Sequence, residues 1–81
     1  MTDRNLETEL RTVLGDELSQ DLSNLAAETP LAEALGIDSL RALELMAAVE
    51  EHFDIVFEDT DLARAHTLRG IHDAILQTRE M

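Results

Sequence analysis

The feature that most constrains the fold is a run of apolar side chains at helical spacing between residues 39 and 53. Ser39 follows Gly36, whose backbone freedom suits a turn, and serine is favoured where a helix begins. At 100° per residue, five apolar side chains fall within one arc, which we take as the core face: Ala42, Leu45, Met46, Val49 and Phe53. The sequence therefore predicts a helix over residues 39–53, with Ser39 at its N-cap or in its first turn.

The opposite arc of this helix mixes acidic and apolar side chains, namely Leu40, Glu44, Ala47 and Glu51, flanked by Leu43 and Glu50. A purely solvated face would not normally carry two leucines and an alanine among its acids. Such a mixture favours a docking surface, where apolar burial supplies affinity and charge supplies orientation. The alternative is that Leu43 is half-buried core and Leu40 packs on the preceding loop.

The N-terminal segment predicts a second amphipathic helix, over residues 3–18, because apolar side chains recur at i, i+4, i+7 and i+8 from Leu6. Thr2 or Asp3 can cap this helix. Gly15 costs up to about 1 kcal/mol relative to alanine, and we expect the helix to continue past it.

Residues 19–38 are expected to form a long loop that is pinned to the core by Leu22 and Leu25. Within this loop, Thr29 as cap and Pro30 as first helical residue predict one short helical turn over residues 31–35, which Gly36 ends.

The C-terminal third predicts an extended connector, a short helix over residues 59–64 and a last helix over residues 67–77. Ile55 or Phe57 in the connector should reach the core. Thr67 can cap the last helix, and its final residues are expected to fray. The fold class is therefore all-α: a small up-and-down bundle of three main helices and a short one, in a single domain spanning residues 1–81.

Charge and composition exclude several classes of function. The 81-residue chain has no cysteine, and its eighteen acids against six basic residues give a net charge of −12. Nucleic acid is not an expected partner, because phosphate binding needs a basic footprint, whereas a basic protein surface would complement the chain. No apolar run approaches the roughly 18 residues of a membrane span, and the N-terminus lacks a signal core, so we expect a cytoplasmic protein.

A family resemblance centres on Leu-Gly-Ile-Asp-Ser-Leu at residues 35–40 and continues through Glu-Leu at 44–45, Glu-Glu at 50–51 and Phe-Asp at 53–54. These residues resemble the acyl carrier protein family around its phosphopantetheine attachment serine, and the similarity continues in register from Leu6 to Leu76. The resemblance implies a monomeric, non-enzymatic carrier. A phosphopantetheinyl transferase would attach 4'-phosphopantetheine from coenzyme A to its serine.

The resemblance also assigns roles to individual residues. Ser39 is the implied attachment point, and Asp38 matches the motif aspartate, which could contact the transferase or its metal and add negative charge at the helix start. The implied partner surface consists of apolar and charged positions that acyl-processing enzymes with basic docking surfaces would contact: Leu40, Arg41, Glu44, Ala47, Glu50 and Glu51. Two residues depart from the family pattern, since Arg41 occupies an often acidic position and Glu58 stands where many members have proline.

Serine catalysis and metal binding are less consistent with the residues present. No Gly-x-Ser-x-Gly elbow surrounds Ser39, so we expect no catalytic residues. His66 and His72 are spaced to lie on different helix faces, no cysteine joins them, and a metal site is not expected. An unmodified acidic adaptor for a basic protein and a weak divalent-ion buffer remain as alternatives, and the sequence leaves the choice between fatty acid and polyketide pathways open.

Overall fold

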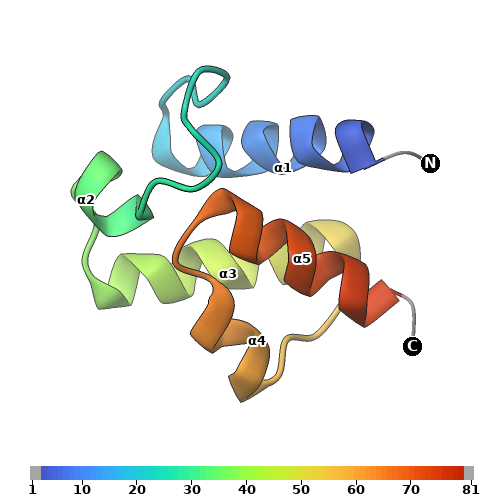
Figure 1. Cartoon of the computed structure of the whole chain (residues 1–81). Helices are drawn as coiled ribbons and strands as arrows, with labels where there is room; N and C mark the ends of the chain where they lie inside the picture. The colour runs from blue at the N-terminus through green and yellow to red at the C-terminus, as the bar shows by residue number, and fades with distance from the viewer. Residues whose placement is uncertain (1–2, 80–81) are drawn as a thin grey trace.

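The computed structural model describes residues 3–79, in which there are helices and no strands. The helices are α1 (Asp3–Leu18), α2 (Leu31–Leu35), α3 (Ser39–Phe53), α4 (Asp59–Arg64) and α5 (Leu68–Arg79). Figure 1 shows α1 running opposite to α3 and α5, with the short α4 set across the end of the connector that follows α3. The chain is thus a small all-helical bundle, which confirms the predicted fold class.

The core lies between α1, α3 and α5, whose apolar stripes face one another. It is completed by Leu22 of the first loop, Leu31 of α2 and Phe57 of the connector. Its buried members are Leu6, Leu10, Leu14, Leu22, Leu31, Leu45, Met46, Val49, Phe53, Phe57, Leu68, Ile71, Ala74 and Ile75. Phe57 is buried and Ile55 is partly buried against the core, as expected of the connector. Burial of this apolar surface is the main force that holds the short helices together.

The predicted short turn over residues 31–35 is confirmed as α2, but the predicted Thr29 cap and the helical position of Pro30 are wrong. Pro30 has an extended backbone with ψ of 124°, no side chain caps the helix, and α2 begins at Leu31. The Leu31 N–H instead donates to the carbonyl oxygen of His66 at 2.8 Å. A main-chain contact with the α4–α5 connection therefore replaces the expected Thr29 cap.

The ends of the last helix also differ slightly from the prediction. The Thr67 hydroxyl accepts a hydrogen bond from the Gly70 N–H at 3.0 Å, which confirms Thr67 as the cap of α5. The helix itself starts at Leu68 and continues to Arg79, beyond the expected end at residue 77. The expected cap at Thr2 lies outside the described residues.

Gly15 does more than lower the helix propensity of α1, because the fold requires a glycine at this position. The chain leaves α1 through Ser19, which has a left-handed φ of 55°, and the Gln20 N–H returns to the Gly15 carbonyl oxygen at 3.0 Å. A Cβ on residue 15 would lie 2.6 Å from the Gln20 carbonyl oxygen. Only glycine allows this close approach without a shift of the backbone.

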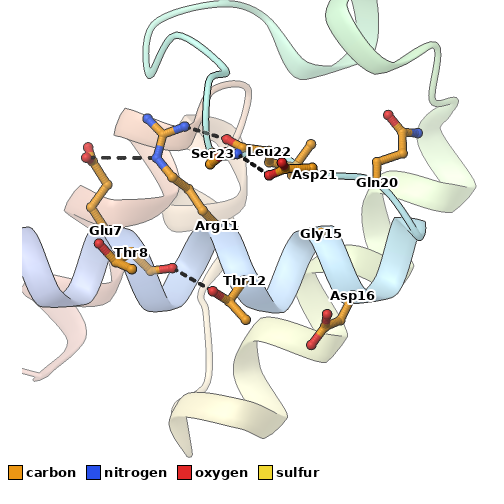
Figure 2. A pocket seen from close by; sticks show the side chains of 10 residues that line it. All are labelled: Glu7, Thr8, Arg11, Thr12, Gly15, Asp16, Gln20, Asp21, Leu22 and Ser23. Atoms are coloured by element: carbon orange, nitrogen blue, oxygen red, sulfur yellow. Dashed lines mark hydrogen bonds and ion pairs between the residues drawn. The ribbon is translucent and has the colours of Figure 1, made fainter.

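Arg11 fastens the long first loop to α1. Its Nη1 donates to the carbonyl oxygens of Leu22 and Leu25, at 2.7 and 2.6 Å. Figure 2 shows the pocket beside it, about 500 Å³ in volume and lined by α1 and the loop. At its edge, the Ser23 N–H donates to Asp21, and this hydrogen bond lowers the pKa of the Asp21 carboxyl. No residue of the predicted site lines this pocket, which therefore belongs to the loop anchorage.

Candidate functional site

At the start of α3, the helix is capped by Asp38, and not by Ser39. Asp38 is the N-cap, with extended backbone angles, and its Oδ1 accepts from the Arg41 N–H at 2.8 Å. Ser39 is the first helical residue, and Gly36 supplies the left-handed turn before it with φ of 65°. Of the two predicted positions for Ser39, the first-turn position is therefore correct, because the adjacent carboxylate occupies the cap.

The Ser39 hydroxyl is exposed at the N-terminal end of a 15-residue helix. Main-chain N–H groups without intrahelical partners and the positive end of the helix dipole gather there. A phosphate ester on this oxygen would meet a favourable electrostatic setting. Among residues 3–79, no hydrogen bond joins the Ser39 hydroxyl to a histidine or carboxylate that could serve as its base.

The outward face of α3 carries an exposed apolar patch. Leu40 is 69% exposed and Leu43 is 57% exposed, and Ala47 lies in the same outward arc. The alternative that Leu43 is half-buried core and Leu40 packs on the loop is therefore wrong. The two leucines and Ala47 therefore form an exposed apolar strip on the outward face of α3.

Arg41 links the start of α3 to the end of α1. Its guanidinium donates to Glu44 Oε1 at 3.2 Å and to the main-chain carbonyl oxygen of Glu17, and it lies 4.0 Å from the Glu17 carboxylate. The sequence did not identify Glu17 as part of this surface. The two residues are 24 positions apart, and no local pattern connects them.

The acids at the far end of α3 differ in their surroundings. Glu50 is half-buried and its Oε2 accepts from the Phe57 N–H at 2.7 Å, so this carboxylate holds the connector in place. Glu51 is exposed, and within the described part of the chain its carboxylate has no hydrogen bond or ion pair. The predicted partner residues thus share one helix, but Glu50 also stabilises the fold through its hydrogen bond to the connector.

A small apolar pocket opens beside the first turns of α3. Its volume is about 110 Å³, and α2, α3 and the α4–α5 connection line it with Pro30, Leu31, Ala32, Ile37, Ala42, Leu45, Met46, Ala65 and His66. Ile37 and Ala42 bracket Ser39 in sequence. The pocket therefore lies beside the helical turn that carries the serine.

His52 and His72 lie away from this pocket and have ordinary partners. His52 Nε2 is 2.8 Å from Glu9 Oε2, a contact between α3 and α1, and His72 Nδ1 lies 3.7 Å from its neighbour Asp73. Across residues 3–79, no group of three or more histidine or acidic side chains is arranged to hold a metal ion. Over the same range, no helix has the length and apolar character needed to cross a bilayer.

Comparison with known proteins adds evidence that is independent of this geometry. The family model for a phosphopantetheine attachment site matches residues 8–75. An acyl carrier protein of Akkermansia muciniphila is 33% identical over 75 residues, covering 93% of this chain and 90% of the relative. An acyl carrier protein of an Exiguobacterium species is 31% identical over 71 residues, covering 88% of this chain and 90% of the relative.

A solved structure agrees at the level of the fold. The crystal structure of an acyl carrier protein from Thermotoga maritima superposes with a TM-score of 0.79 at 19% identity, covering 96% of this chain and 91% of that one. The family match extends over most of the chain, and the site lies within it. The chain therefore belongs to the acyl carrier protein family, whose members carry a covalently attached 4'-phosphopantetheine.

Proposed function

We propose that Ser39 is the attachment point of the 4'-phosphopantetheine arm, and that the chain delivers acyl thioesters on this arm to successive enzymes of fatty acid or polyketide-type biosynthesis. The observation that carries the proposal is the exposed Ser39 hydroxyl in the first turn of α3, within the region that the attachment-site model matches. We further propose that the protein is monomeric, acts in the cytoplasm and has no catalytic residues of its own.

The surroundings of Ser39 fit a phosphodiester. The N-terminal end of α3 offers unpaired N–H groups and a favourable dipole, and the exposed hydroxyl is open to an external transferase. During attachment, Ser39 Oγ forms a bond to the pantetheine-side phosphorus of coenzyme A, and the adenosine bisphosphate leaves. The transferase supplies magnesium and the base that takes the serine proton, and Asp38 would contact the transferase or its metal.

Once attached, the arm supplies a thiol that holds the acyl group as a thioester. The protein's own residues then present the arm and provide a recognisable surface around it. The partner surface that we assign to this role lies on α3 and consists of Leu40, Arg41, Glu44, Ala47, Glu50 and Glu51.

We also propose that the pocket between α2 and α3 shelters the first part of an acyl chain. At about 110 Å³ it is smaller than the engineered 150 Å³ cavity that accommodates benzene, so only a short apolar segment would fit without movement of the core. NMR spectra should show shifted methyl signals for Leu31, Ile37 and Leu45 in the acylated protein. Unchanged methyl signals would reject this sheltering.

The carrier role is tested on protein isolated from its own host. Fragmentation of the proteolytic peptide that contains Ser39 should locate a phosphopantetheine group on this residue, and hydroxylamine should release any bound acyl group, since it cleaves thioesters. Cells that carry only the Ser39→Ala form should lose the pathway. An unmodified Ser39 in the host, together with full function of Ser39→Ala, would instead support the adaptor alternative.

A further inference from the structure

The charges beside Ser39 are arranged differently from those at the other end of α3. Arg41 lies 3.2 Å from the Glu44 carboxylate and is also held by the main-chain oxygen of Glu17 and by its carboxylate at 4.0 Å. An isolated surface ion pair is weak, but this guanidinium is fixed by acceptors from two helices. Glu44 thus already has a positive charge of the same protein beside it, which it shares with Glu17.

Glu51 lies on the same side of α3 as Glu44, two turns further along, because seven residues at 100° each return almost to the same angle. It is exposed and has no counter-ion within residues 3–79. At 1.5 Å per residue, its Cα lies about 18 Å along the helix from that of Ser39. Of the two outward acids Glu44 and Glu51, the one without a counter-ion is therefore the one remote from the serine.

We infer, building on the proposed function, that partner enzymes cover Leu40 and Leu43 with an apolar pocket and place their cationic side chain at Glu51, whereas Arg41 masks Glu44. A lysine or arginine that approached Glu44 would face the Arg41 guanidinium, and such like-charge contacts oppose binding. The partner recognised by this surface has an apolar depression flanked by a basic group about 18 Å from its serine-binding centre, and no basic group facing Glu44.

The test uses the phosphopantetheinyl transferase of the host organism as the partner and measures kcat/KM for arm transfer at low ionic strength. Glu51→Gln should lower kcat/KM by about fivefold and flatten its dependence on salt, because steering by a free charge is lost. The matched variant Glu44→Gln should stay within about twofold of the wild type, because Arg41 already pairs with the Glu44 carboxylate and opposes an approaching cation.

A double-mutant cycle isolates the masking. In the Arg41→Gln background, the Glu44→Gln change should lower kcat/KM by several-fold, because the carboxylate has become available. Arg41→Lys keeps the positive charge and should preserve the small effect of Glu44→Gln, which separates charge from the structural link to α1. Thermal unfolding of each variant checks that the helices remain in place.

The inference is overturned if Glu44→Gln alone lowers kcat/KM as much as Glu51→Gln, or if its effect is the same with and without Arg41. It is also overturned if Glu51→Gln has no effect. If the wild-type protein still receives the arm on Ser39, each of these outcomes rejects the inference but leaves the proposed function intact. Complete absence of transfer would reject the proposed function, and the inference with it.

Discussion

At the scale of single residues, Gly70 is the glycine at which an added side chain would make the closest contact. A Cβ at this position would overlap the carbonyl oxygen of Arg64, the last residue of α4. Helix propensity alone predicts that Gly70→Ala gains up to about 1 kcal/mol, whereas steric overlap in a packed region costs about 1–3 kcal/mol. We expect overlap to dominate, so that Gly70→Ala lowers the free energy of unfolding, measured by urea denaturation, by up to about 2 kcal/mol.

The reverse exchange at an exposed helical site provides the control. Ala47→Gly on the outward face of α3 should cost about 1 kcal/mol through propensity alone. If Gly70→Ala stabilised the protein, the close approach of α4 and α5 at this point would be incorrect.

At the scale of secondary-structure elements, the start of α3 assigns stability and the proposed function to different residues: Asp38 caps the helix and Ser39 is the proposed attachment point. Asp38→Ala removes the side chain that accepts the Arg41 N–H and should cost about 1 kcal/mol, within the usual range for a lost cap. Ser39→Ala removes an exposed hydroxyl that is not the cap, and should change the free energy of unfolding by less than about 0.5 kcal/mol.

Asp38→Asn is the matched control, because the amide oxygen can still accept the hydrogen bond and the stability should be largely retained. Urea unfolding curves of the three variants, analysed with one shared m-value, give the free energies of unfolding to be compared. A larger loss for Ser39→Ala than for Asp38→Ala would contradict the assignment of the cap.

Local sequence signals explain why the helices could be predicted and the contacts between them could not. Apolar periodicity indicated α1 and α3 at their observed bounds, because this signal lies within each helix. The requirement for glycine at residues 15 and 70, and the capping of α2 by the His66 carbonyl oxygen, depend on segments far apart in sequence. The same holds for the candidate site, where Ser39 and the outward leucines could be predicted but the Glu17–Arg41 contact could not.

At the scale of the whole molecule, a net charge of −12 on 81 residues makes self-repulsion a general cost of folding. The thermal midpoint should therefore rise with ionic strength, because salt screens repulsion between exposed acids. Sodium and magnesium chloride should give similar curves when plotted against ionic strength. A midpoint that does not change with salt would contradict the repulsion, and a saturating effect of magnesium at low concentration would support the ion-buffer alternative.

The central claim is that Ser39 accepts the arm that makes this chain a carrier, and intact-mass measurement tests it most directly. The purified protein and its Ser39→Ala variant are incubated with coenzyme A, magnesium and a broad-specificity phosphopantetheinyl transferase. A single added phosphopantetheine on the wild type and none on the variant is the predicted result. Modification of the Ser39→Ala variant, or no mass change in the wild type with several transferases, would contradict the claim.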